Sequence, residues 1–343
     1  MFIITAHLDI FKESEAVNGL ATRYLGILNF STLFMLLFTA GKQFMDGMGR
    51  TKIGMYITLG GLLLNIFLNW ILIYGNWGAP ALGIEGTAIA TSIARVLMTI
   101  AILVFIWRDK QIKKLREEFQ NSEVKDKSYV VEIIRIGVPA GLQFFWEVAA
   151  FSAALIMSGW LGEQYLASHQ IAISLASVTF MVLTGIAAAG TIMTGFSYGA
   201  KDLEGIRMAG NTILVLTLII ELIFAILFLI LKDTLPLLYT DNAEVISIAS
   251  AMLVFAAFFQ VSDGFQAAAA GALRGIQDVT IPAIIAFISY WIIMVPLCYV
   301  LAFNFHLGLS GIWIGFIVGL TIAAVLQIGR FKLKVRSMKF KEL

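Results

Sequence analysis

The sequence predicts an all-α polytopic membrane protein with about nine transmembrane helices. Hydrophobic residues make up 59% of the 343 residues and charged residues 13%, about half of the roughly 25% that soluble domains carry. The apolar residues gather in runs without Asp, Glu, Lys or Arg, which are residues 53–84, 164–200 and 279–329. A membrane-spanning helix needs about 20 apolar residues, so the last run holds two spans. Because the runs are continuous and do not alternate, they exclude a transmembrane barrel.

Basic turns and short loops divide the chain into its helices. The first helix ends before Lys42. The second lies within the first uncharged run, and the third begins at the end of that run. The fourth begins after the basic stretch 108–127, the fifth fills the second uncharged run, and the sixth follows Lys201. The seventh ends near Arg274, and the last two share the third uncharged run. The predicted helices are 18–41, 53–75, 83–107, 130–158, 165–198, 206–231, 242–271, 279–303 and 307–329.

The distribution of Lys and Arg predicts the orientation of these helices. The stretch 108–127 holds seven basic residues and the tail 330–343 holds six, whereas the loop after the sixth helix holds only Lys232. Basic residues remain on the cytoplasmic side of a membrane. We therefore expect a multi-pass protein of the plasma membrane with a cytoplasmic C-terminus and, after nine spans, an N-terminus outside.

An internal repeat relates the first three helices to the last three. The segment "LGIEGTAIA" (82–90) matches "LGLSGIWIG" (307–315) at an offset of 225 residues, and each opens a helix after a short outer loop. Three further helices precede the last three but none precede the first three. The symmetry predicts that about 100 residues, enough for three more spans, are missing before Met1. Restoring them would give twelve helices, and parallel half-repeats are typical of secondary transporters.

Several segments resemble the multidrug and toxin extrusion (MATE) transporters along nearly the whole chain. They are "LLLNIFLNW", "LGIEGTAIAT", "GVPAGLQFFWEVAAFSAALIMSGWLG", "FSYGAKDLEGIRMAG" and "FFQVSDGFQAAAAGALRGIQDVTIP". The resemblance implies twelve helices in two six-helix lobes around a central cavity, of which this chain lacks the first three helices. On this basis residues 1–107 form a partial N-terminal lobe of three helices, 108–128 a cytoplasmic linker, and 129–343 a six-helix lobe with a basic cytoplasmic tail.

Two acids are predicted to lie near the middle of the membrane. Glu147 is 12 residues from Arg135, and Asp263 is 11 from Arg274. At 1.5 Å per residue both acids are about 17 Å deep, where an unpaired charge costs at least ~2.5–3.5 kcal/mol. Such a pair can bind and release a proton, or hold Na⁺ as a hard cation. The alternative is a protonated acid that forms a hydrogen bond between helices.

The resemblance adds weight to the ion-binding interpretation. Glu147 and Asp263 match the ion-coupling acids of the family's C-terminal lobe, so a coupling H⁺ or Na⁺ is expected there and no other cofactor. Some Na⁺-dependent relatives carry Tyr at the position of Phe259, which is itself a candidate to line the cavity. Gln143, Gln260 and Gln266 flank the acids at helical spacing and are candidates to line the same cavity.

Other polar and special residues have two interpretations each. Asn65 and Asn69 face one side of a helix and, with Thr87, match an N-lobe polar site of the family, or they join helices by hydrogen bonds. Pro139 is a candidate hinge or a harmless kink. Glu221 and Arg95 are also predicted at membrane depth. Each is either a local contact between helices or a functional group. The three histidines, His7, His169 and His306, are expected at the outer interface.

The function predicted from these observations is secondary active antiport. The transporter would export organic cations or drugs in exchange for H⁺ or Na⁺, and the aromatic residues near the acids would hold flat cations. A flippase for a lipid-linked precursor would need more deep Arg or Lys than Arg95. An enzyme is excluded because HExxH and GxSxG are absent. An inactive truncated fragment is the remaining alternative.

The same composition limits the partners. The net charge of +2 makes nucleic acid an unsuitable partner, and the single Cys298 excludes a disulfide framework. We expect small, cationic substrates, membrane lipid around the helices, and a monomer.

Overall fold

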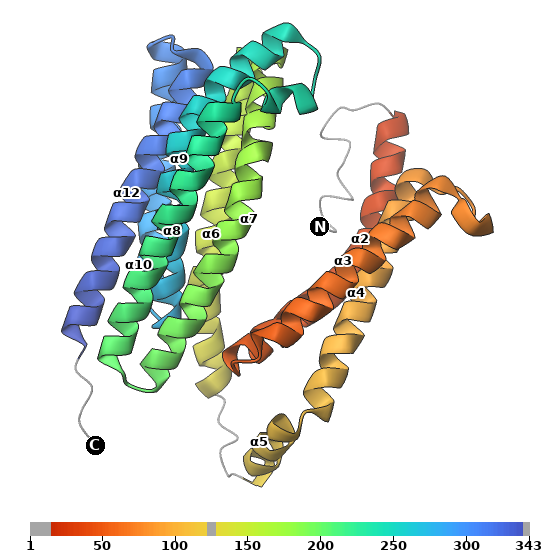
Figure 1. The fold of residues 1–343 in the computed structure, drawn as a ribbon, viewed down its shortest axis with the longest axis vertical. Helices are drawn as coiled ribbons and strands as arrows, with labels where there is room; N and C mark the ends of the chain where they lie inside the picture. The colour runs from red at the N-terminus through yellow and green to blue at the C-terminus, as the bar shows by residue number, and fades with distance from the viewer. Residues whose placement is uncertain (1–14, 122–127, 339–343) are drawn as a thin grey trace. The chain divides into compact units, whose positions relative to one another are not determined.

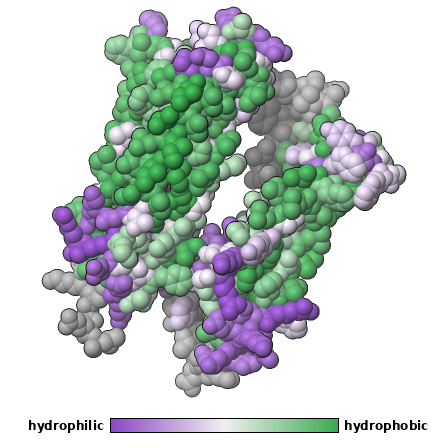
Figure 2. All heavy atoms as spheres, in the orientation of Figure 1, coloured by the Kyte–Doolittle hydropathy of each residue, from purple (hydrophilic) through white to green (hydrophobic). Residues whose placement is uncertain are grey.

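The computed structural model describes residues 15–121 and 128–338, and its chain divides into two units, Met1–Lys125 and Asp126–Leu343 (Figure 1). His7, residues 122–127 of the expected linker and the last five residues of the tail lie outside the described residues. Within the described residues, nine helices are long and apolar enough to cross a membrane. The predicted fold class is thereby confirmed: the protein is an all-helical, multi-pass membrane protein. Figure 2 shows hydrophobic residues along the middle of the helices and hydrophilic residues gathered at their ends.

The first unit is built from three long helices and one short one. They are α2 (Glu15–Gly47), α3 (Thr51–Tyr74), α4 (Gly83–Arg108) and α5 (Lys110–Asn121), with a short 3₁₀ turn, η2 (Asn76–Gly78), after α3. Helix α4 packs on both α2 and α3.

Helix α5 lies within residues 108–128, the stretch expected to be a linker. It is held to the rest of its unit because Ile112 is buried in one cluster with Met45 and Ile102. Arg50 adds an ion pair with Asp109. The start of the expected linker is therefore a packed helix.

The second unit contains six spans around α9. The elements are α6 (Ser128–Leu161), α7 (Glu163–Gly199), α8 (Leu203–Leu231), η3 (Leu235–Leu238), α9 (Ala243–Gly275), α10 (Thr280–Phe287), η4 (Ile288–Met294), α11 (Val295–Tyr299), η5 (Val300–Asn304) and α12 (Gly308–Ser337). Helix α9 packs against α7, α8 and α12. Small residues allow this close packing: a Cβ at Gly271 would lie 2.5 Å from the backbone oxygen of Ala187 on α7.

The eighth span is a helix with two wider, π-helical segments. It runs from α10 to η5, and η4 and η5 are its π-helical parts. A π-helical segment shifts the side chains that follow it around the helix axis, and such segments are frequent at functional sites. In this span η4 directs Tyr290 into the core, where it is fully buried.

The internal repeat has a structural counterpart in the two units. Gly83 begins α4 and Gly308 begins α12, and both have a φ of 55°, which favours glycine. Three residues later, a Cβ at Gly86 would lie 2.6 Å from the Leu72 oxygen, and one at Gly311 would lie 2.6 Å from the Leu301 carbonyl carbon. Both matched segments therefore use a left-handed glycine and then a glycine that contacts the backbone of the preceding span.

Candidate functional site

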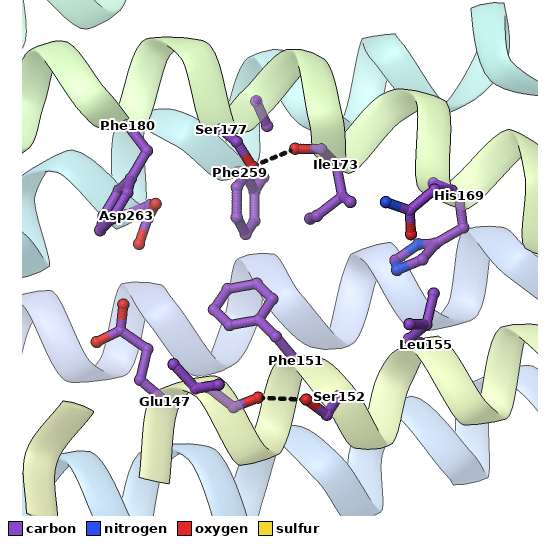
Figure 3. Close-up of a pocket in the computed structure, with 13 residues that line it drawn as sticks. Glu147, Phe151, Ser152, Leu155, His169, Ile173, Ser177, Phe180, Phe259 and Asp263 are labelled. Atoms are coloured by element: carbon purple, nitrogen blue, oxygen red, sulfur yellow. Dashed lines mark hydrogen bonds between the residues drawn. The ribbon is translucent and has the colours of Figure 1, made fainter. Parts of the chain in front are cut away.

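A pocket of about 320 Å³ lies within the second unit, between α6, α7 and α9 (Figure 3). Glu147 enters it from α6 and Asp263 from α9, and their carboxylates lie at the same end of the pocket and point toward each other. His169 lines its other end from α7. Two acids that the sequence predicts at the same depth are thus brought to one cavity.

Asp263 is the more deeply buried of the two acids. Its residue is 5% exposed, and its Oδ1 has no hydrogen-bond partner within the described part of the chain. Glu147 is half-buried. The guanidinium of Arg274 lies 5.0 Å from the ring centroid of Phe144, one turn before Glu147, close enough for its charge to act on that acid. The site therefore combines a buried acid, a more accessible acid and a cation at its edge.

Aromatic rings form much of the pocket wall. Phe151, Phe180 and Phe259 line it, and the rings of Phe151 and Phe259 meet edge to face at 6.0 Å. The hydroxyls of Ser152 and Ser177 donate to backbone oxygens of their own helices at 2.8 Å. A cavity with aromatic walls and carboxylates at one end is suited to an organic cation, which gains both charge pairing and cation–π attraction.

The three glutamines expected beside the acids do not line this pocket. Gln143, Gln260 and Gln266 are each buried, with 4% or less of the residue exposed. The amide of Gln260 has no hydrogen-bond partner among the residues that the structure describes. Helix α6 continues through Pro139 without interruption, and its role as a hinge stays a prediction.

Two buried residues of this region are not indicated by the sequence, one at the far end of the pocket and one beside the acids. His169 was expected at the outer interface, but it is 2% exposed, lines the pocket, and packs edge to face with Trp313 at 5.7 Å. The Tyr290 side chain lies close enough to Glu147 and Asp263 for both charges to act on it. Only the bulky, apolar run around each residue is visible in the sequence, which shows neither how α7 packs nor where a π-helical segment forms.

The polar residues predicted in the first unit form a local hydrogen-bonded chain. Asn69 donates to Asn65 at 3.1 Å, and Asn65 donates to Thr91 of α4 at 3.3 Å. Thr91, one turn after the predicted Thr87, is thus the residue that meets Asn65. Arg95 also has a partner within its own unit, because it donates to the hydroxyl of Ser31 at 2.9 Å.

A multi-pass helical bundle with facing acids in an aromatic cavity is typical of a membrane transporter. The profile of the MatE family matches residues 1–71 and 139–300. The chain therefore belongs to the MatE family, whose members are transporters and not enzymes.

Named relatives agree with this assignment. The chain is 36% identical to the multidrug resistance protein NorM of Vibrio cholerae, over 92% of this chain and 71% of that protein. It is 34% identical to the probable multidrug resistance protein NorM of Bacillus cereus, over 96% of this chain and 73% of that protein.

Solved structures show the same fold. An outward-facing multidrug resistance MATE family transporter of the MOP superfamily matches with a TM-score of 0.87 and 21% identity, over 97% of this chain and 73% of that one. A MOP superfamily transporter from Pyrococcus furiosus matches with a TM-score of 0.85 and 22% identity, over 98% of this chain and 74% of that one.

Proposed function

We propose that this protein exports organic cations across the plasma membrane in exchange for a coupling ion, either H⁺ or Na⁺. The observation that carries the proposal is that Glu147 and Asp263 face each other in a pocket lined by aromatic rings. The relatives that are named multidrug resistance proteins support the substrate class. A flippase for phosphate-bearing lipids is disfavoured, because this pocket presents negative charge to its occupant.

Antiport follows from competition for the two carboxylates. A protonated acid is neutral and offers an organic cation no charge, whereas an ionised pair attracts it, and more strongly in the low-dielectric surroundings of the buried Asp263 than in water. Binding of the cation and binding of the proton therefore oppose each other, and this opposition is reciprocal. Na⁺ would compete in the same way, but Phe259 contributes a ring at the position where some Na⁺-dependent relatives carry a Tyr oxygen. We therefore favour H⁺.

The test is whether a bound cation expels protons from the purified chain. Ethidium is added to the protein in lipid nanodiscs in weakly buffered solution, and a pH indicator records proton release while fluorescence records binding. We expect the protein to release protons as ethidium binds. Asp263→Asn and Glu147→Gln should each lose most of that release, and the double variant should lose no more than either single one, because the two acids act as one site.

A control variant and a Na⁺ titration distinguish ion coupling by the two acids from a structural role, and H⁺ from Na⁺. Glu132→Gln, an exposed position on the same helix as Glu147, should release protons as the unmodified protein does. Full proton release by Asp263→Asn would show that its carboxylate has a structural role, against the proposal. Displacement of ethidium by Na⁺ at constant pH, with no proton release, would identify Na⁺ as the coupling ion.

A further inference from the structure

A third acid, Glu221 of α8, is buried in the second unit outside the pocket. Its residue is 0% exposed. Neither carboxylate oxygen has a hydrogen-bond partner within residues 15–121 and 128–338. A helix–helix hydrogen bond, one of the two roles that the sequence allows for this residue, is thus not formed by any described side chain or backbone group. An acid in that position needs either a proton or a ligand, since an uncompensated buried charge is very costly.

The carboxylate of Glu221 is directed at the backbone beside Asp263. A Cβ at Gly264 would lie 2.7 Å from Glu221 Oε1 and 3.0 Å from the methyl carbon of Thr217. Gly264 follows Asp263 in α9, and its lack of a side chain leaves room for the Glu221 carboxylate. Because Gly264 is the next residue after Asp263, the Glu221 carboxylate lies close enough for its charge to act on Asp263.

The polar groups around Glu221 leave it only one charged neighbour. Thr217, one turn earlier on α8, is 1% exposed and its hydroxyl also has no partner in the part of the chain described. On α9 the ionisable group whose charge acts together with that of Glu221 is Asp263, which also senses Glu147 on α6, and both Asp263 and Glu147 act on Tyr290 of η4. No ion pair joins Glu221 to a described residue of α7 or α12.

We propose that Glu221 exchanges a proton with Asp263, so that the second unit holds its protons on three carboxylates and not on two. In this step a proton leaves an Asp263 carboxyl oxygen and bonds to a Glu221 carboxylate oxygen, while the negative charge moves the opposite way. The total charge of the unit does not change. The inference rests on the proposed function, in which Asp263 binds the coupling proton.

Such an exchange gives the pocket a property that two acids alone lack. Glu221 does not line the pocket, so a proton stored on it is not in direct competition with the organic cation. Asp263 can then pass its proton to Glu221 as the cation binds, and the proton leaves the unit from Glu221, so that cation binding still expels it, as the proposed function requires.

Infrared difference spectroscopy of the purified chain in nanodiscs tests this role directly. Spectra recorded in acidic and alkaline buffer report each carboxylic acid that loses its proton, through its C=O stretching band. We expect Glu221→Gln to lose one component of that band, while Glu204→Gln, an exposed acid in the first turn of the same helix, loses none of the buried components. In Asp263→Asn, the titration midpoint of the Glu221 component should shift by about one pH unit or more, the size that marks interacting sites.

A second variant keeps both acids and changes only their contact. Gly264→Ala places a methyl group against Glu221 Oε1 and forces the carboxylate away from its position beside Asp263. We expect all band components to remain but the midpoint of Glu221 to shift. This variant decides the question if Glu221→Gln does not fold.

The outcomes separate this inference from the proposed function. A difference spectrum of Glu221→Gln identical to that of the unmodified protein would show that Glu221 never titrates and would overturn the exchange, even if ethidium still expels protons through Glu147 and Asp263. An unshifted Glu221 midpoint in Asp263→Asn would overturn it as well. A loss of the Glu221 component together with the shift supports the exchange, even if ethidium releases no protons and the proposed function fails.

Discussion

Asp233, in the turn between α8 and α9, shows how a surface acid of this protein responds to pH. Its carboxylate accepts hydrogen bonds from the hydroxyl of Ser250 and from the Lys232 ammonium. These bonds hold the pKa of Asp233 below its ordinary value of 3.8. Because the folded protein prefers the ionised form, the stability from this group is present above that ordinary value and is lost as the pH falls through the lower folded pKa.

We predict that Ser250→Ala lowers the apparent melting temperature at neutral pH and that this difference shrinks in strongly acidic buffer. The substitution removes the main hydrogen bond that favours the ionised carboxylate, so its effect should follow the charge of Asp233. Thermal unfolding in detergent at the two pH values measures this. In an Asp233→Asn background the effect of Ser250→Ala should not depend on pH. An equal difference at both pH values in the otherwise unmodified protein would contradict the prediction.

At the same scale, the sequence indicates some site residues and hides others. Counting from Arg135 and Arg274 to Glu147 and Asp263 works because a helix has a constant rise per residue, and the structure brings both acids to one pocket. His169 and Tyr290 could not be found in this way. Their positions depend on how α7 and a π-helical segment pack in three dimensions, and a single sequence does not record this.

At the scale of the elements, all nine predicted spans are present among the described residues, and the differences lie at their ends. The first helix was predicted to end at residue 41 but continues to Gly47, and the last was predicted to end at residue 329 but continues to Ser337. Lys and Arg end a membrane span because charge is costly in lipid. They do not end a helix, since both residues have high helix propensity. Charge therefore predicts where the membrane ends and not where the helix ends.

The contact between α7 and α9 gives a prediction about helix packing. We expect Gly271→Ala to lower stability by about 1–3 kcal/mol, the usual cost of an extra methyl group in a packed interior. The new Cβ would lie 2.5 Å from the Ala187 oxygen, so the two helices would have to separate. Denaturation of the purified protein in detergent measures the change.

A matched substitution on α7 serves as the control. Gly185 has open space where its Cβ would be, so Gly185→Ala should be neutral or slightly stabilising, because Ala has the higher helix propensity. If both substitutions had the same effect on stability, the close approach at Gly271 would not limit the packing of α7 on α9.

At the scale of the whole molecule, the orientation of the chain in the membrane can be measured by labelling introduced cysteines. The positions of the basic residues predict the result, and the position of the natural cysteine keeps the background low. Cys298 is fully buried, so the natural chain offers little reactive thiol to a reagent added outside. Seven basic residues occupy 108–127, and they favour the cytoplasmic side. Two spans, α6 and α7, lead from this stretch to the turn that contains Lys201, which therefore lies on the same side of the membrane. One further span, α8, leads to the turn before α9, which therefore lies on the other side.

We therefore predict that a cysteine before α9 is accessible from outside the cell and that one on α5 is not. Asp241→Cys and Glu118→Cys are both at exposed positions, so burial does not bias the comparison. A membrane-impermeant maleimide added to intact cells should label Asp241→Cys, and Glu118→Cys should be labelled only after the membrane is permeabilised. The unmodified chain, with Cys298 alone, measures the background. Labelling of Glu118→Cys but not of Asp241→Cys in intact cells would reverse the orientation. The basic C-terminal end of α12 would then lie outside.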